Sequence, residues 1–280
     1  MKSRISRATS RRSTQPEGRF ELGALILTYH AVEPGPAPLC LAPTLFRSHL
    51  DAFEELGVST LTVSGLAEAL RDGTLPDRAV AITFDDGCAS AVRTAAPGLA
   101  ERGMAATFYC VAGHLGGWND WPTQPASAPR LALANADELR ELAQLGFEIG
   151  AHGYDHVPLG EAGAEVARRE IERSKQVLEE VTSRTVRSFA YPYGVPPGTG
   201  AARLAAQLYG TACGNLLRRV DARSDLMRLP RVDAHYLRHP GVLQRVAAGQ
   251  WETYLRLRAA GARARRLLRS DHVPADGRSE

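Results

Sequence analysis

Short apolar segments alternate with amphipathic segments along this chain from about residue 24 to residue 233. The apolar segments are rich in Val, Ile, Phe and Tyr and have the length of buried strands. Between them, apolar residues recur every three or four positions, which is typical of helices that cover a sheet. The predicted strands lie at 24–30, 58–63, 79–84, 105–112, 147–152, 187–192, 211–213 and 228–233. The predicted helices lie at 44–57, 65–73, 90–102, 137–146, 161–182 and 200–210.

Repeated strand–helix units of this kind predict an α/β fold with a parallel sheet. Nearly seven units in roughly 230 residues favour a sheet that closes into a barrel. Thr44 and Ser64 stand where the first two helices begin, and we expect them to be N-caps, with Gly57 ending the first helix. In folds of this class the functional site forms at the carboxyl ends of the strands.

Unusual polar residues gather at those strand ends. His30 closes the first strand, and Asp85 and Asp86 close the strand at 79–84. His152 closes "FEIGAH", and His156 follows four residues later. Residues 191–193 (Tyr-Pro-Tyr) close "SFAYPY". Four strands therefore deliver ionisable or special backbone groups to one face of the predicted barrel.

Two imidazoles and a carboxylate around a divalent ion form a common catalytic metal arrangement. His152 and His156 can reach one ion if the chain turns after the strand, as Gly153 permits. Because successive strand residues point to opposite faces, Asp85 and Asp86 cannot both face inward unless the strand ends between them. We therefore expect one aspartate to coordinate and the other to lie beside the bound water. Each motif alone also has a structural explanation, such as an ordinary turn or a buried histidine pair.

The composition limits the remaining classes. The chain has 280 residues and 44% hydrophobic content, and its longest apolar runs are too short to cross a bilayer. The N-terminus lacks the apolar centre of a secretory signal, so a cytoplasmic protein is expected. The four cysteines form no CxxC pair, which argues against a zinc finger and suits a reducing compartment; Cys88 adjoins the aspartates.

Charge is distributed unevenly along the chain. Residues 1–20 carry six Lys or Arg and one acid, and residues 251–280 carry seven against four, within a total of +3. The segment between them is therefore mildly acidic, with a net charge of −5. This gives no footprint for nucleic acid over the core.

Three motifs together resemble those of the polysaccharide deacetylase family, the NodB-homology or carbohydrate esterase 4 group. They are "TFDDG" (83–87), "HGYDH" (152–156) and "FAYPYG" (189–194), and the resemblance covers roughly residues 22 to 235. It implies a single-domain distorted (β/α)7 barrel and a divalent metal, most often Zn²⁺. It also implies a hydrolase that removes N-acetyl groups from an N-acetylated sugar or glycan.

The resemblance implies a role for each matching residue. Asp85 would be the catalytic base, and Asp86, His152 and His156 would bind the metal. Tyr193 would offer its backbone N–H to the oxyanion. The usual arginine of the third motif is absent, since Ala190 stands there, and no Leu-x-His motif for the general acid is evident.

The general acid has two candidates. The context "LTYHAV" resembles the circularly permuted poly-N-acetylglucosamine deacetylases, whose acid histidine lies on an early strand, so His30 is preferred to His235. Deformylase, O-acetyl esterase and small-amide hydrolase activities remain alternatives on this scaffold, as does a non-catalytic carbohydrate-binding relative.

Three segments follow from this assignment: a disordered basic tail (1–20), a catalytic barrel (21–240) and a basic C-terminal helix and tail (241–280). Residues 251–270 could make weak contact with a membrane surface, although a solvated helix is the commoner case. In the loop 113–130, Trp118 and Trp121 could either stack on sugar rings or pin the loop to the barrel.

Overall fold

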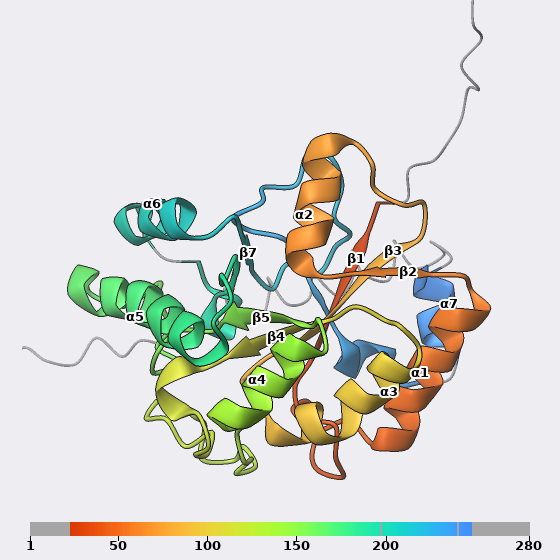
Figure 1. Ribbon diagram of the computed structural model, residues 1–280, viewed down its shortest axis with the longest axis horizontal. Coiled ribbons are helices and arrows are strands. Elements are labelled where there is room, and N and C mark those ends of the chain that lie inside the picture. The colour runs from red at the N-terminus through yellow and green to blue at the C-terminus, as the bar shows by residue number, and fades with distance from the viewer. Residues whose placement is uncertain (1–22, 197, 240, 248–280) are drawn as a thin grey trace, which may run out of the picture.

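A single curled parallel sheet with helices on its outer face forms the centre of the molecule (Figure 1). The computed structural model describes residues 23–196, 198–239 and 241–247. Its strands are β1 (Leu25–Tyr29), β2 (Ser59–Leu61), β3 (Ala79–Phe84), β4 (Thr107–Cys110), β5 (Glu148–Ala151), β6 (Ser188–Ala190), β7 (Thr211–Cys213) and β8 (Val232–Asp233). Its α-helices are α1 (Pro43–Glu55), α2 (Val63–Asp72), α3 (Ala96–Glu101), α4 (Ala136–Gln144), α5 (Ala164–Thr182), α6 (Thr199–Leu208) and α7 (Val242–Ala247). A π-helical turn (Ala91–Ala95) precedes α3, and 3-10 turns lie at Ala112–His114, Pro192–Gly194 and Ala234–Leu237.

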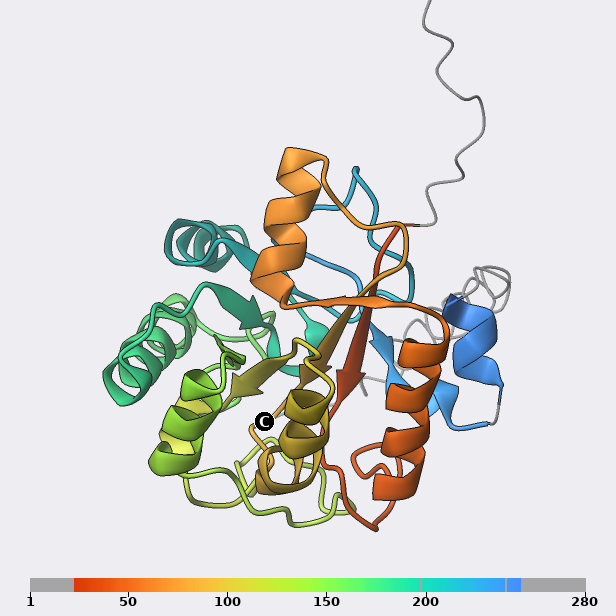
Figure 2. The same ribbon diagram turned by 45° about the vertical axis from the view of Figure 1, so that its right-hand side comes forward.

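The strand order is β7-β6-β5-β4-β3-β1-β8, and β2 also pairs with β3. Every pairing between these strands is parallel. The turned view shows α1, α3, α4 and α5 following one another around the outside of the curled sheet (Figure 2). The strand–helix alternation and the parallel sheet expected from the sequence are therefore confirmed.

An irregular segment closes the barrel between its two edge strands. Leu229 N–H donates to Ala212 O (2.9 Å), and Gly214 N–H donates to Leu229 O (2.9 Å), so residues 226–231 run beside β7. Directly afterwards β8 pairs with β1, with Val232 opposite Leu27. One continuous stretch thus joins β7 to β1, and this explains why the closure is distorted rather than a regular ladder.

Alternation along β3 decides which side chains face the barrel interior. Val80, Ile82 and Phe84 belong to the core that packs under the helices, whereas Ala79 and Ala81 belong to the core inside the barrel. The interior cluster combines alanines on the strands with aliphatic side chains and the Tyr109 ring, and α2 contributes Val63 and Leu66 to it. Asp85 continues the inward phase of Ala79 and Ala81 just beyond the strand, and this places its carboxylate above the interior core.

The two predicted caps are wrong, although their helices are present. Helix α1 begins one residue earlier than expected, with Ala42 at its N-cap, Pro43 at its start and no side-chain cap. Helix α2 is capped by Thr62, whose side chain accepts from Gly65 N–H. Ser64 lies inside α2 instead, and its hydroxyl donates to the Glu148 carboxylate at the start of β5.

Part of the predicted C-terminal segment belongs to the folded core. Leu243 and Val246 of α7 are buried in the same cluster as the barrel helices. The predicted helix at 251–270 and the tail at 1–20 lie outside the described residues. Within residues 23–247, apart from 197 and 240, no helix combines the length and apolarity needed to span a membrane.

Candidate active site

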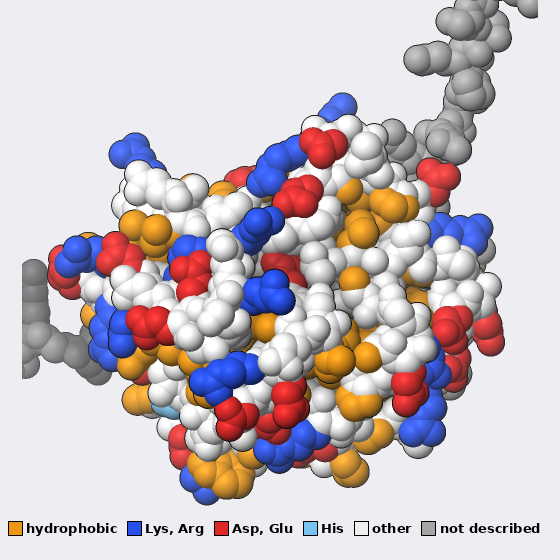
Figure 3. Space-filling model, in the orientation of Figure 1, with side chains coloured by type: hydrophobic (Ala, Val, Ile, Leu, Met, Phe, Trp, Pro, Cys, Tyr) orange, Lys and Arg blue, Asp and Glu red, His pale blue; other side chains and the backbone are white. Residues whose placement is uncertain are grey.

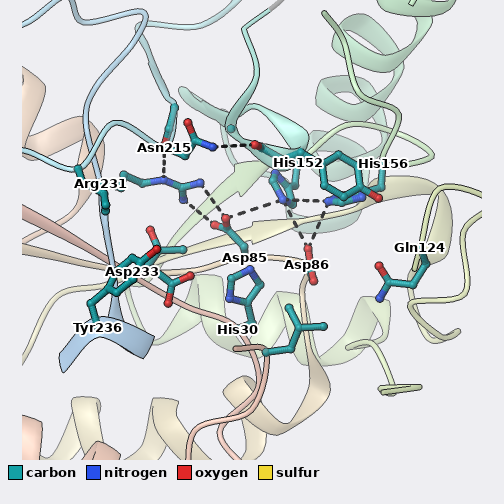
Figure 4. A pocket seen from close by; sticks show the side chains of 16 residues that line it. His30, Asp85, Asp86, Gln124, His152, His156, Asn215, Arg231, Asp233 and Tyr236 are labelled. Atoms are coloured by element: carbon teal, nitrogen blue, oxygen red, sulfur yellow. Dashed lines mark hydrogen bonds and ion pairs between the residues drawn. The ribbon is translucent and has the colours of Figure 1, made fainter. Parts of the chain in front are cut away.

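A cavity of about 310 Å³ opens at the carboxyl ends of the strands (Figure 4). Its lining includes all six residues singled out from the sequence: His30, Asp85, Asp86, His152, His156 and Tyr193. His235 is not among the residues that line it, and its backbone N–H donates to Asp233 (2.8 Å). The geometry therefore favours His30 over His235 as the histidine that can reach a molecule in the cavity.

Both neighbouring aspartates face this cavity because the strand ends before them. Strand β3 stops at Phe84, and Asp86 adopts a left-handed backbone conformation with φ of 68°. A non-glycine residue rarely takes this conformation, and such strain clusters at functional sites. Asp85 and Asp86 are 4% and 5% exposed, so each carboxylate needs a partner inside the protein.

Asp86 finds its partners in the two histidines. His152 Nε2 and His156 Nε2 lie 3.5 Å and 3.4 Å from Asp86 Oδ1. One possible metal-ligand atom from each of the three residues lies within 4.8 Å of the others, and all three residues are buried. This is the Asp–His–His arrangement expected from the motifs.

A backbone carbonyl orients one imidazole and an aromatic ring packs against the other. His152 Nδ1 lies 2.8 Å from Ala190 O, so a proton on Nδ1 leaves Nε2 free to act as a ligand. His156 has φ of 58° and packs against the Trp121 ring, with 4.2 Å between ring centroids. The two Nε2 atoms are 3.3 Å apart.

Asp85 has a different partner, which the sequence reasoning missed. The Arg231 guanidinium donates to both carboxylate oxygens of Asp85, at 2.7 Å and 2.8 Å. Its Nε–H donates to Gly214 O (3.0 Å), so the guanidinium is itself fixed. Arg231 occupies the segment that closes the barrel, and it supplies an arginine although Ala190 stands in the third motif. A charged residue inside "LPRVD" was the signal that could have revealed it.

Electrostatics keep both carboxylates ionised. Burial alone would raise the pKa of Asp85, but the charge of Arg231, followed by that of His152, brings the pKa below its usual value. Burial also opposes ionisation of Asp86, yet hydrogen bonds from His152 and His156 hold its pKa well below the usual value. Burial lowers the pKa of His156.

Glu170 of α5 holds the loop between the two histidines and was also missed. It is 1% exposed, and its carboxylate accepts from the N–H groups of Tyr154 (2.9 Å), Asp155 (3.0 Å) and Val157 (3.4 Å). A side chain at Gly153 would come within 2.7 Å of this carboxylate. The loop therefore wraps closely around Glu170, and this fixes the backbone on both sides of His156.

Tyr193 lies at the edge of the cavity in a strained conformation. Its φ is 57°, and Asn215 Nδ2 donates to its carbonyl oxygen (2.9 Å). Its hydroxyl donates to Thr123 O (3.0 Å), which joins it to the loop 113–130. In that loop Trp121 is 2% exposed and pins the loop, whereas Trp118 is 42% exposed beneath the Arg130 guanidinium.

The donor set fits a divalent cation. Within this buried group, the guanidinium balances one of the two carboxylates, and Asp86 faces only imidazoles. An unbalanced buried carboxylate is costly, and a bound cation compensates it. One carboxylate and two imidazoles are ligands that zinc and similar ions accept. Cys88 does not enter this set, since its side chain is fully buried and burial raises the pKa of its thiol.

Comparisons with known proteins agree with this geometry. The family model for polysaccharide deacetylase matches residues 72–212. The chain is 26% identical over 170 residues to one curated relative and 26% identical over 156 residues to another. The second is poly-beta-1,6-N-acetyl-D-glucosamine N-deacetylase of Staphylococcus epidermidis, where the match covers 54% of this chain and 52% of the relative. The matched region thus spans about half the length of these curated relatives.

Solved structures extend the similarity over most of the chain. IcaB from Ammonifex degensii has a TM-score of 0.66 and 26% identity, covering 81% of this chain and 97% of that one. The deacetylase PplD of Streptococcus pyogenes, in complex with acetate, has a TM-score of 0.65 and 26% identity, covering 75% and 92%. The fold, the site motifs and a family match over half of its residues agree: this chain belongs to the polysaccharide deacetylase family.

Proposed function

We propose that this protein is a metal-dependent N-deacetylase of an N-acetylated amino sugar or glycan, releasing acetate and a free amine. The observation that carries the proposal is that one cavity holds a group of potential metal ligands and, beside it, a carboxylate with a different partner. Three potential metal ligands lie together there, beside a second carboxylate clamped by Arg231 and within reach of His30. The name of the Staphylococcus epidermidis relative supports an N-acetylglucosamine glycan as the substrate.

Asp86, His152 and His156 would hold the metal, with zinc the ion that best suits two imidazoles and a carboxylate. When bound, such an ion supplies Lewis acidity, which polarises an acyl carbonyl and makes water in the site more acidic. Its charge also balances the carboxylate of Asp86. Proton transfer would fall to the residues around these ligands.

Asp85 would accept the proton of the attacking water. The Arg231 clamp keeps this carboxylate ionised and fixes its direction, which a general base requires. His30 would donate a proton to the departing nitrogen, because an amine leaves readily only when protonated. The Tyr193 N–H would donate to the oxygen that becomes negative during attack.

Acetate release from purified protein tests the proposal. We expect release from a β-1,6-linked N-acetylglucosamine oligosaccharide, its loss after chelation and its return on adding back Zn²⁺, with metal content measured by mass spectrometry. Formate release from formylated sugars, or hydrolysis of O-acetyl groups only, would instead assign one of the alternative hydrolase activities. Bound metal with no hydrolysis of any acylated sugar would support a binding protein.

A further inference from the structure

Gln124 presents an unused hydrogen-bond donor to the cavity. Its Nε2 atom is buried and has no hydrogen-bond partner among the described residues. The residue nevertheless lines the cavity, and Figure 4 shows its amide pointing from the loop 113–130 toward Asp86 and His156. A buried amide without a partner destabilises the protein, so such a group calls for a ligand or water to complete it.

The turn that carries Gln124 is held in place on three sides. Gln124 N–H donates to Trp121 O (2.9 Å), which closes the turn 121–124. Trp121 is buried against His156, and Thr123 Oγ1 donates to His156 O (3.3 Å). Tyr193 completes the frame through its hydroxyl bonds to Thr123. The turn is therefore tied to a predicted metal ligand and to a cavity-edge residue, and its geometry is organised before a ligand arrives.

The position of Gln124 separates its role from the catalytic groups. In Figure 4 it lies on the side of Asp86 opposite Asp233 and Tyr236, with His30 between. The acyl carbonyl of a substrate would be held at the Asp86 cluster by the metal, so a donor beside that cluster would meet a neighbouring group of the same sugar. The oxygen atoms left over on an amino sugar are those of its ring and its hydroxyl groups, and a neutral amide suits a hydroxyl oxygen.

We propose that Gln124 is a specificity-determining residue that donates a hydrogen bond to a hydroxyl of the sugar ring bearing the acylamino group. The inference rests on the proposed N-deacetylase function and narrows its substrate class to amino sugars over simple amides. A simple amide offers no hydroxyl, so it would leave the buried donor unpaired. Pockets built to bond a hydroxyl discriminate in this way against analogues that lack it.

A cycle of protein and substrate changes tests this assignment. Acetate release is measured for the wild-type chain and Gln124→Ala on a β-1,6-linked N-acetylglucosamine tetrasaccharide and on its set of monodeoxy analogues. We expect Gln124→Ala to lower kcat/KM about 10-fold on the parent sugar. For one deoxy analogue, the kcat/KM of the wild type should also fall about 10-fold relative to the parent sugar. The kcat/KM of Gln124→Ala should be the same on that analogue as on the parent sugar.

Controls separate recognition from damage to the fold. Gln207→Ala, on the exposed face of α6, should match the wild type in every assay. Melting temperature and metal content should be the same for Gln124→Ala and the wild type.

Equal kcat/KM values for Gln124→Ala and the wild type on the parent sugar would overturn the inference. It would also be overturned if every deoxy analogue penalised the variant as strongly as the wild type, which is the result expected if a water alone completes the amide. Lack of acetate release by the wild type from all sugars would overturn the proposed function and the inference together.

Discussion

Two adjacent carboxylates of the same chemistry have opposite surroundings in this site. Asp85 accepts hydrogen bonds from a guanidinium of the irregular segment that closes the barrel, whereas Asp86 faces two imidazoles at the end of β5 and in the loop after it. The difference arises from one backbone feature, the left-handed turn at Asp86, which brings both side chains to the same cavity from different directions. Both residues are aspartates, so the residue type does not distinguish their roles. The partner of each carboxylate does.

The largest expected effect comes from exchanging either carboxylate for an amide. Asp85→Asn should retain metal and lose about 10²–10⁴-fold in turnover, since it removes the proton acceptor. Asp86→Asn should instead lose most of the bound metal, and with it the activity. Metal content and acetate release, measured on both variants, distinguish the two roles, and Asp72→Asn at the exposed end of α2 is the control. Full turnover by Asp85→Asn would refute the base assignment.

Removing the Arg231 guanidinium should affect Asp85 and leave the three proposed metal ligands unchanged. In Arg231→Met the pKa of Asp85 should rise, because burial then acts without the opposing positive charge. The acid limb of the pH–kcat profile should therefore move to higher pH, and turnover at neutral pH should fall about 10- to 100-fold. Metal content should stay at the wild-type value.

The control for this change is Arg228→Met, which lies three residues away and is exposed. Loss of metal in Arg231→Met, with an unshifted pH profile, would mean that the Asp85–Arg231 pair does not act independently of the metal ligands. Because a buried partner is left unpaired, the free energy of unfolding should also fall, by about 3–5 kcal/mol.

Glu170→Gln should weaken metal binding and leave the Asp85–Arg231 pair unchanged. The amide keeps the shape of the side chain but loses one acceptor oxygen and the negative charge that hold the N–H groups of residues 154, 155 and 157. Metal affinity should fall about 10-fold or more, as it does when groups that orient ligands are changed. Titration of the metal-free protein with Zn²⁺ measures this, and Glu180→Gln on the exposed side of α5 should bind like the wild type.

The smallest effect is expected for Tyr193→Phe. The change removes the hydroxyl bonds to Thr123 and leaves the backbone N–H proposed to meet the oxyanion. Turnover should fall by less than about fivefold, in line with the loss of neutral hydrogen bonds made by one exposed hydroxyl. A loss as large as that of Asp85→Asn would show that the hydroxyl, and not the backbone, is the working group.

The sequence predicted the parallel sheet, the closure into a barrel and six residues of the cavity lining, because strand periodicity and strand-end polar residues are local patterns. The role of Arg231 could not be predicted, because its partner is 146 positions away and the pairing depends on how the barrel closes. Glu170 looked like one more acid on an amphipathic helix, and only the folded loop reveals its three N–H donors. The caps failed for a local reason: Pro43 starts α1 without a polar cap, and Thr62 precedes Ser64.

The closing segment has a consequence for when the protein becomes competent. Arg231 emerges from the ribosome after every other residue proposed to take part in catalysis, so a nascent chain that has already paired β1 with β3 still holds an uncompensated Asp85. Any product of premature termination before residue 231 would lack the guanidinium that donates to both carboxylate oxygens of Asp85. The ion pair of the proposed general base can therefore form only after nearly the whole barrel has been synthesised.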